Sequence, residues 1–278
     1  MKILLFGHRG MLGTDLFSQL KIKHEIIGLD KDEINIVSAA QCKQAIEENV
    51  PDIIINAAAY TDVDACETNK DECFAVNAEA VRNIAEACRD ENIRIIHFST
   101  DYVFDGTGDE PYSEEHTCNP INTYGRSKLA GEIYLQNLSD NYLLIRTSWL
   151  YGKNGNNFVR KIIEKAEKVN KLEVVDDQIG SPTYTKDLAA AIDLLLDRSI
   201  TGIFHLTNRG SCSWFQFAVK ILQEAAIMGV QVAPIKSDKL TRPARRPFYS
   251  VLSNQKFIQE TGKTMQPWQL ALQDYLKK

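Results

Sequence analysis

Short apolar runs alternate with longer stretches of helical periodicity through the first half of the chain. The runs are rich in Ile, Leu, Val and aromatic residues, which is typical of strands buried on both faces of a parallel sheet. They lie at Ile3–Phe6, Ile26–Leu29, Ile53–Ile55, Ile93–Phe98 and Tyr142–Ile145. Helices are predicted between them, at Leu12–Leu20, Ala39–Glu48, Asp71–Asp90 and Thr123–Gln136. Right-handed crossovers between such elements predict an α/β fold with a doubly wound parallel sheet.

The pattern loosens after Trp149, where Gly and Asn crowd into residues 152–157. Such a segment predicts a boundary between a domain of residues 1–150 and a smaller lobe of residues 151–278. The sheet pattern returns with apolar runs at Leu172–Val175 and Ile203–Leu206 and a helix between them at Thr185–Leu196. We therefore expect the segment near 172–206 to rejoin the first domain, so that the two parts are interleaved.

Composition and charge narrow the class of protein. The 278 residues are 44% hydrophobic and 25% charged, as in ordinary folded proteins, and suffice for about two domains. With 32 Lys and Arg against 37 Asp and Glu, the net charge of −5 argues against a nucleic-acid partner. The six cysteines form no CxxC pair, which argues against a structural metal or a disulfide framework. The N-terminal apolar run is too short for a signal peptide, and we expect a cytoplasmic protein without a membrane partner.

A glycine-rich turn follows the first predicted strand. Gly7, Gly10 and Gly13 form a GxxGxxG pattern that leads directly into a helix. Glycine permits positive φ and a close approach of the backbone to a pyrophosphate, while the helix N-terminus offers unpaired N–H groups. This placement favours dinucleotide binding by the first domain over an ordinary turn.

The second predicted strand ends in Asp30, at about the distance from the turn at which dinucleotide sites carry a ribose-binding carboxylate. The carboxylate favours NADH and would repel the 2′-phosphate of NADPH. Arg9 and Lys31 offer partial compensation, so NADPH remains an alternative. Asp30 also fits an ordinary loop carboxylate.

A second cluster of polar residues follows the fourth predicted strand. Thr100 ends that strand, and Tyr124 and Lys128 share one face of the next helix at i and i+4. An ammonium near a phenol lowers the phenol pKa and makes it a usable proton donor near neutrality. A Tyr-x-x-x-Lys pair also occurs by chance, but ligands of such sheets bind at the carboxyl ends of the strands, where Thr100 emerges.

The glycine turn, Thr100, Tyr124 and Lys128 resemble the extended short-chain dehydrogenase/reductase pattern, which implies a Rossmann-like fold. Longer segments resemble the dTDP-4-dehydrorhamnose reductase family, and they are Asn56–Asp64, Phe98–Gly106, Tyr124–Glu132, Arg146–Gly152 and Asp177–Thr183. The resemblance implies reduction of the C4 keto group of a dTDP-linked 4-keto-6-deoxy sugar, with hydride from NADH or NADPH. Tyr124 would donate the proton, Thr100 would bind the carbonyl or the phenol, and Lys128 would hold the nicotinamide ribose.

The resemblance also implies sets of binding residues. Those implied for the cofactor are Gly7, Arg9, Gly10, Met11, Leu12, Gly13, Asp30, Asn35, Ile36, Ala57, Ala58, Ala59, Tyr60, Asn77, Ser99, Tyr124 and Lys128. Those implied for the sugar nucleotide are Val63, Asp64, Asp101, Tyr102, Val103, Phe104, Trp149, Asn157, Gln178, Pro182 and Thr183. Ala57–Ala59 equally suit simple packing, and Trp149 equally suits a core position.

The roles of an arginine cluster, of two departures from the family pattern and of a metal ion stay open. Arg242, Arg245 and Arg246 suit either a diphosphate site or a solvated charge run. Cys66 and Asn35 replace the Ala and Asp that are usual in the family, and the second change loosens the inference about adenine contacts. Some family members bind Mg²⁺ at a dimer contact through glutamates, so the resemblance allows Mg²⁺ and a homodimer, although no residue here identifies a metal site.

Two rival functions deserve comparison. An epimerase or dehydratase of the same superfamily would use the same Tyr-Lys pair, but dehydratases usually carry Asp-Glu after the threonine, whereas Asp101-Tyr102 follows Thr100 here. A non-catalytic subunit, like the regulatory partner of methionine adenosyltransferase, shares the fold as well. The retained Thr100, Tyr124 and Lys128 favour an enzyme.

Overall fold

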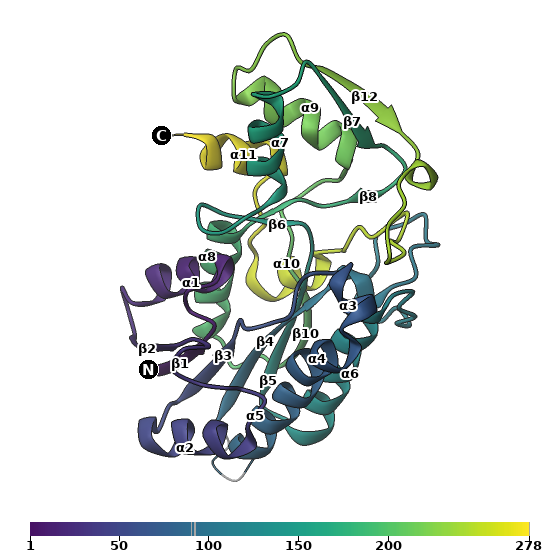
Figure 1. Ribbon diagram of the computed structural model, residues 1–278. Helices are drawn as coiled ribbons and strands as arrows, with labels where there is room; N and C mark the ends of the chain where they lie inside the picture. Colours follow the sequence, from purple (N-terminus) through teal and green to yellow (C-terminus); the bar gives the residue numbers. More distant parts are fainter. Residues whose placement is uncertain (90, 92, 278) are drawn as a thin grey trace.

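A six-stranded parallel sheet forms the lower part of the molecule in Figure 1, and a smaller group of helices and short strands is stacked on it. The computed structural model describes residues 1–89, 91 and 93–277. The sheet has the order β10-β5-β4-β3-β1-β2. Its strands are β1 (Lys2–Phe6), β2 (Glu25–Leu29), β3 (Ile53–Asn56), β4 (Arg94–Thr100), β5 (Tyr142–Thr147) and β10 (Gly202–His205). The order reverses between β1 and β3, which confirms the doubly wound fold.

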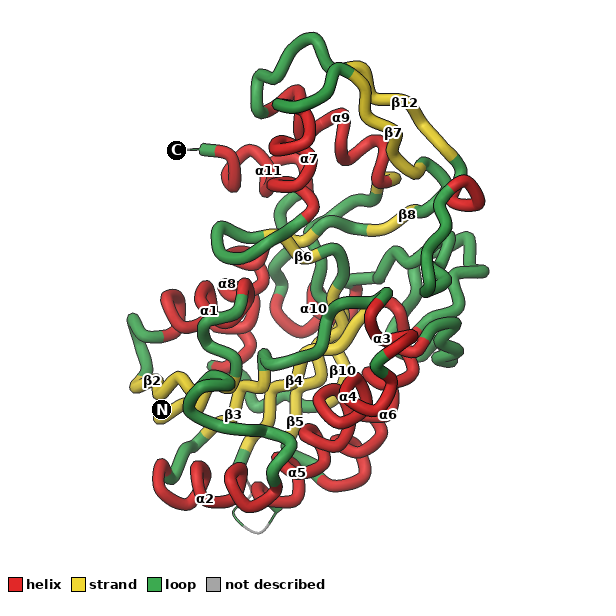
Figure 2. Tube along the Cα trace, viewed as in Figure 1, coloured by secondary structure: helices red, strands yellow, loops and turns green. Residues whose placement is uncertain are grey.

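Helices cover both faces of the sheet (Figure 2). One face carries α1 (Met11–Leu20) and α8 (Thr185–Leu196), and the other carries α2 (Ala39–Asn49), α5 (Ala80–Cys88) and α6 (Thr123–Leu138). Strand β1 shows why both faces must be covered: Ile3 and Leu5 pack in one core and Leu4 and Phe6 in the other.

The helix predicted at Asp71–Asp90 is divided into α4 (Lys70–Phe74), a π-helical segment (Ala75–Glu79) and α5. Asp90 itself lies outside the described residues. The π segment contains Asn77, whose buried side chain hydrogen-bonds Tyr60 in the segment after β3 and Ser127 of α6. A π-helical turn inserted in an α-helix often marks a functional position, because it redirects one side chain without ending the helix.

The upper part contains α7 (Phe158–Ala166), α9 (Trp214–Glu224) and α11 (Trp268–Leu276) around their own hydrophobic core. Three two-stranded pairs join them, and their strands are β6 (Leu150–Tyr151) with β9 (Thr183–Tyr184), β7 (Lys171–Val175) with β12 (Gln231–Ile235), and β8 (Ile179–Gly180) with β11 (Cys212–Ser213). Short helices α3 (Ala65–Thr68) and α10 (Gln255–Thr261) lie near the sheet.

Two of the three pieces predicted within residues 172–206 lie with the central sheet. Helix α8 packs on α1, and β10 joins β5 at the edge of the central sheet. The prediction for Leu172–Val175 is wrong, because β7 pairs with β12 in the upper part. Lys171 and Glu173 are exposed while Leu172, Val174 and Val175 are buried, so exposed and buried positions alternate over most of this strand. That alternation is typical of a covered edge pair and does not suit a central strand.

Along the described residues, no helix combines the length and the apolar character needed to cross a membrane.

Candidate active site

The glycine turn between β1 and α1 is packed so tightly that side chains would not fit. Gly7 has φ +78°, and a Cβ there would lie 2.8 Å from the backbone N of Ala58. A Cβ on Gly13 would lie 2.0 Å from the carbonyl oxygen of Gly7. The helix N-terminus is therefore held directly against β1 and the segment after β3, as the dinucleotide prediction requires. Gly10, Met11 and Leu12 line a cavity at this point.

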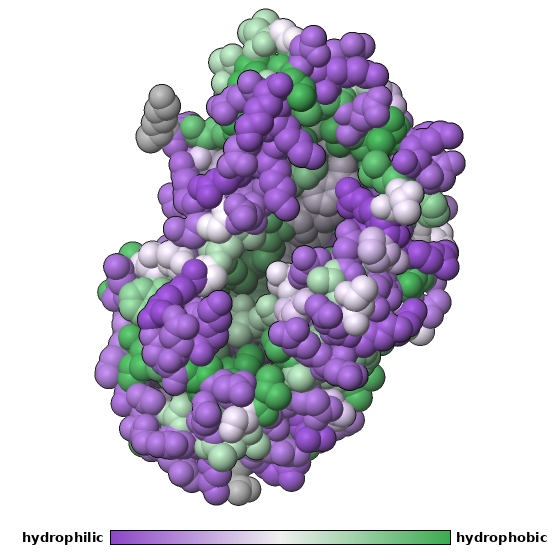
Figure 3. Space-filling model, viewed as in Figure 1, coloured by the Kyte–Doolittle hydropathy of each residue, from purple (hydrophilic) through white to green (hydrophobic). Residues whose placement is uncertain are grey.

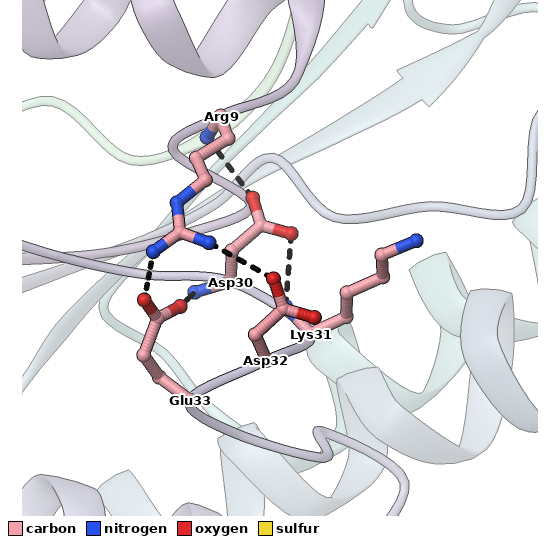
Figure 4. A network of polar contacts seen from close by, with 5 residues as sticks. All are labelled: Arg9, Asp30, Lys31, Asp32 and Glu33. Atoms are coloured by element: carbon pink, nitrogen blue, oxygen red, sulfur yellow. Dashed lines mark hydrogen bonds and ion pairs between the residues drawn. The ribbon is translucent and has the colours of Figure 1, made fainter.

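Asp30 lies at the end of β2 and faces this turn (Figure 4). Its carboxylate accepts hydrogen bonds from the backbone N–H of Arg9 at 3.0 Å and of Lys31 at 2.8 Å. Burial opposes the charge, but these N–H groups hold the pKa of Asp30 below its usual value. The Arg9 guanidinium turns away and pairs with Asp32 and Glu33. Arg9 is thus already engaged by carboxylates instead of being available to a 2′-phosphate.

Asn77 ties the segment after β3 to the helix that carries Lys128. Its Oδ1 accepts from the backbone N–H of Tyr60 at 2.9 Å, and its Nδ2 donates to the Tyr60 carbonyl and to Ser127 Oγ, both at 3.0 Å. Ala57 and Ala59 line the cavity, whereas Ala58 packs against the core. Of the adenine-side residues, Asn35 is exposed and Ile36 is buried in the core.

Thr100, Tyr124 and Lys128 line the same cavity, as predicted from the ends of β4 and α6. Helix α6 begins at this point because the Asn122 side chain caps it by accepting from the backbone N–H of Gly125 at 2.8 Å. Gly125 allows the helix to touch η2 (Asp101–Val103), since a Cβ there would lie 2.1 Å from the Tyr102 carbonyl oxygen.

The electrostatics of this cluster differ from the expectation in one respect. Burial raises the pKa of Tyr124, although a hydrogen bond with Thr100 opposes the shift. The expected lowering by Lys128 is therefore not found. Burial also lowers the pKa of Lys128 to about 8, despite the nearby Glu132 and Cys73. Tyr124 consequently keeps its proton at neutral pH, which suits a proton donor.

Asp101 is a second buried acid in the cluster. Burial raises its pKa to about 7, against opposing hydrogen bonds from Ser250 and Thr100. The Thr100 hydroxyl donates to Asp101 Oδ1 at 3.0 Å. Asp101 lines the cavity beside Tyr102.

The cavity has a volume of about 460 Å³ and lies where the sheet meets the upper part. Figure 3 shows a hollow between these two parts of the molecule. Its predicted lining residues are Gly10, Met11, Leu12, Ala57, Ala59, Val63, Ser99, Thr100, Asp101, Tyr102, Tyr124, Lys128 and Trp149. Sequence reasoning missed Thr61, Phe98, Thr147, Ser148, Leu150 and Trp214. The sequence could have indicated Thr147 as a lining residue, because it ends β5 at the same sheet edge as Thr100.

Trp149 stacks on Trp214, which belongs to α9 in the upper part. The ring centroids are 3.4 Å apart and the planes differ by 7°. Trp149 has φ +47°, which is uncommon for a large side chain, and a Cβ on Gly180 would lie 2.5 Å from its indole. The indole pair is therefore held in place from two sides at the cavity wall.

Several residues predicted to bind the sugar nucleotide have structural roles within the fold. Val103 and Phe104 are fully buried in a hydrophobic cluster with Tyr112 and Leu252. Asn157 caps α7 by accepting from the Arg160 N–H at 3.0 Å. Buried residues that do not line the cavity also include Gln178, Pro182 and Thr183.

Asp64 and Arg246 are paired with each other. Arg246 Nη1 lies 3.0 Å from Asp64 Oδ1, and Nη2 lies 2.8 Å from Oδ2. The guanidinium lowers the pKa of Asp64, against the effect of burial. Arg246 is thus engaged by a carboxylate and is not a solvated charge, while Arg242 and Arg245 are exposed.

Across the described part of the chain, no group of three or more His, Cys, Asp or Glu side chains is placed to hold a metal ion.

Comparison with known proteins agrees with this geometry. The family model described as "RmlD substrate binding domain" matches residues 1–278. The chain is 36% identical to a dTDP-4-keto-6-deoxy-D-glucose reductase of Streptomyces niveus, over 97% of this chain and 94% of the relative.

Two solved structures are similar over nearly the whole chain. One is a dTDP-4-dehydrorhamnose reductase of Clostridium acetobutylicum, 40% identical, with a TM-score of 0.96 over 99% of this chain and 98% of that one. The other is a dTDP-4-dehydrorhamnose reductase of Bacillus anthracis in complex with NADP, 39% identical, with the same TM-score and coverage. The fold, the cavity and these likenesses agree, and the chain belongs to the dTDP-4-dehydrorhamnose reductase family.

Proposed function

We propose that this protein reduces the C4 keto group of dTDP-4-dehydro-6-deoxy-L-mannose to give dTDP-L-rhamnose. The observation that carries the proposal is the meeting of Thr100, Tyr124 and Lys128 in one cavity at the carboxyl ends of the strands. We further propose that residues 1–150, together with α8 and β10, bind the dinucleotide, while residues 151–278 mainly hold the sugar nucleotide.

The glycine turn, Asp30 and Lys128 would hold the reduced nicotinamide cofactor, which would supply the hydride for the carbonyl carbon. Tyr124, which keeps its proton because burial raises its pKa, gives that proton to the carbonyl oxygen. Thr100 lines the same cavity, and we assign to it a hydrogen bond with the carbonyl or with the phenol that orients the reacting groups. In its protonated form, Lys128 stabilises the negative charge that develops on the oxygen atoms. The ketone thereby gains one hydride and one proton, and the products are the alcohol and the oxidised nicotinamide.

We propose NADH as the favoured cofactor and NADPH as the alternative. Asp30 holds its charge at the position expected for the ribose hydroxyls, and Asp32 and Glu33 already neutralise Arg9. A 2′-phosphate there would meet carboxylates without an unpaired arginine. The NADP complex of the Bacillus anthracis relative makes the comparison of both cofactors the direct test.

The proposal is tested by following nicotinamide oxidation with the purified protein and dTDP-4-dehydro-6-deoxy-L-mannose, and by identifying the sugar product. Tyr124→Phe should bind NADH normally and lose most of its turnover, because only the proton donor is removed. Tyr134→Phe is the matched control, since Tyr134 lies on the same helix and bonds Glu79. Near wild-type turnover of Tyr124→Phe would contradict the assignment.

Product analysis also separates the second candidate, reduction of another dTDP-linked keto-sugar. The Streptomyces niveus relative favours this alternative, because its name assigns a different 4-keto-6-deoxy sugar. If no keto-sugar is reduced although NADH binds, the non-catalytic subunit becomes the better interpretation. A homodimer, bound Mg²⁺ and a cytoplasmic location stay predictions.

A further inference from the structure

A buried chain of three polar side chains lies directly beneath the cavity. Asn56 ends β3 and His97 faces it on β4, where the two residues are partners in the sheet register. Asn56 Nδ2 lies 3.3 Å from His97 Nδ1, and His97 Nε2 lies 3.2 Å from Lys128 Nζ. All three side chains are at most 2% exposed. The sequence offered a strand interior at His97 and no reason to connect it with Lys128.

The orientation of the Asn56 amide is determined by the backbone. Asn56 Oδ1 accepts a hydrogen bond from the Ala58 N–H at 3.2 Å. Turning the amide over would place its NH₂ group against that N–H. Nδ2 therefore faces His97, and because an amide NH₂ is only a donor, His97 Nδ1 must be the acceptor.

The orientation of Asn56 in turn determines which nitrogen of His97 carries hydrogen. Burial and the nearby Lys128 lower the pKa of His97 well below its usual value, although a hydrogen bond with the Asn56 backbone opposes the shift, so the ring is neutral. A neutral imidazole with an unprotonated Nδ1 carries its hydrogen on Nε2. That N–H is directed at Lys128 Nζ, which is an acceptor only as the neutral amine.

Resting on the proposed function, we propose that Asn56 and His97 are positioning residues whose polarised hydrogen-bond chain holds Lys128 in place and favours its neutral amine over its ammonium. Charging Lys128 requires His97 to move its hydrogen to Nδ1, where it meets the Asn56 NH₂ group. The hydrogen-bond chain thus disfavours the charged form of Lys128 through a specific contact, in addition to the effect of burial.

The other groups around Lys128 act in the opposite direction. Glu132, one turn further along α6, and Cys73 of α4 both raise the pKa of Lys128. The Glu132 carboxylate is also held by Arg146 of β5, with Arg146 Nη2 2.7 Å from Glu132 Oε2, so part of its charge is compensated. Tyr124 on the preceding turn is uncharged at neutral pH. These opposing effects leave the pKa of Lys128 at about 8, so that its amine both takes up and releases protons near neutral pH.

An isosteric substitution that reverses the direction of these hydrogen bonds tests the proposal. In Asn56→Asp, both carboxylate oxygens are acceptors, so one still accepts from Ala58 and the other now accepts from His97 Nδ1–H. His97 Nε2 then accepts from the Lys128 ammonium. Nitrogen-15 NMR of labelled histidine should show the Nε2–H form in the unmodified protein and the Nδ1–H form in the variant. The signal of His97 is assigned by its loss in His97→Phe.

Carbon-13 NMR of labelled lysine then measures the titration of Lys128, assigned with Lys128→Arg. We expect the Lys128 pKa to rise by at least about one unit in Asn56→Asp. The added carboxylate also acts through space, so Asn56→Asp is repeated in the His97→Phe background, where most of the rise should disappear. The unchanged rise in that background, or an Nδ1–H form of His97 in the unmodified protein, would overturn the proposal.

If His97→Phe fails to fold, His97→Gln serves in its place, because a glutamine carbonyl accepts from the Lys128 ammonium and should raise the Lys128 pKa by itself. An unchanged or lowered Lys128 pKa in His97→Gln contradicts the proposal. None of these measurements needs a substrate. Evidence against the hydrogen-bond chain is therefore distinguishable from evidence against the proposed reaction, because only measurements of turnover test the reaction.

Discussion

Arg246 and Asp64 form a two-point ion pair that joins parts of the chain 182 residues apart. The carboxylate also accepts from the backbone N–H of Ala244 at 3.2 Å, so the arginine segment is held at three points against the start of α3. Tyr102 lies close enough for Arg246 to affect its pKa. The pair thus fastens a segment of the upper part beside one wall of the cavity.

Arg246→Ala should loosen this segment. Charged hydrogen bonds contribute about 1.5–3 kcal/mol each, and Asp64 is partly solvated, so we expect a loss near the lower end of that range in the free energy of unfolding. The KM of the sugar nucleotide should rise while that of NADH stays constant. Urea unfolding and steady-state kinetics measure both effects. Arg245→Ala, which removes an exposed neighbouring charge, is the control, and equal effects of the two changes would contradict the role of the pair.

The cofactor preference depends on the charge of Asp30. Asp30→Asn should raise the ratio of kcat/KM for NADPH to that for NADH by at least about tenfold, because two charges about 4 Å apart repel by roughly 1–4 kcal/mol at and near a protein surface. Initial rates with both cofactors give the ratio. Glu25→Gln, an exposed change on the same strand, should leave it unaltered. An unchanged ratio in Asp30→Asn would place the preference elsewhere.

The indole pair predicts an effect on the sugar nucleotide alone. Trp214→Ala removes the ring on which Trp149 stacks, and aromatic pairs contribute about 0.5–1.5 kcal/mol beyond burial. We expect the sugar-nucleotide KM to rise by up to about tenfold with the NADH KM unchanged. Trp214→Phe keeps an aromatic partner and should lie close to the unmodified protein. A larger effect on NADH than on the sugar nucleotide would show that the pair serves the cofactor.

The buried pair of Glu132 and Arg146 connects α6 to β5 beneath the cavity. The side chains are 0% and 3% exposed, and Arg146 Nε and Nη2 donate to the carboxylate at 3.0 and 2.7 Å. Glu132→Gln leaves a buried guanidinium without its counter-charge, which costs about 3–5 kcal/mol. Urea unfolding measures the loss. Glu86→Gln, an exposed change on α5, should cost less than about 0.5 kcal/mol, and a similar small cost at Glu132 would refute the argument.

Asp101 predicts a pH dependence of stability. Burial raises its pKa to about 7 in the folded protein, against 3.8 for the ordinary carboxyl. Between these values the folded state binds a proton that the unfolded state has lost, so the contribution of Asp101 to stability falls as pH rises through this window. In Asp101→Asn that contribution is absent. The difference in unfolding free energy between the two proteins should therefore change from pH 5 to pH 7.5 in favour of the variant, and a constant difference would contradict the shift.

Local sequence signals were sufficient to predict the central sheet and the meeting of Thr100, Tyr124 and Lys128 in one cavity. Glycines are needed at Gly7 and Gly13 because neighbouring backbone leaves no room for a side chain, and that requirement is visible in the spacing alone. The i and i+4 spacing places Tyr124 and Lys128 on one helix face, and the apolar runs identify the strands whose ends carry Thr100. Such features depend on backbone geometry over a few residues, so no knowledge of distant contacts is required.

Distant contacts decided what these residues do. Strand β7 pairs with β12 and lies outside the central sheet. Val103 and Phe104 pack in a hydrophobic cluster that includes Leu252, which is distant in the sequence. Asp64 contacts Arg246, Trp149 stacks on Trp214, and Lys128 lies next to His97. The spacing of these residues in the sequence does not predict any of the three contacts. The sequence by itself thus determined the sheet, the glycine turn and the reactive side chains. Only the tertiary structure decided their charges and partners, because burial and pairing depend on what the rest of the fold brings within a few ångströms.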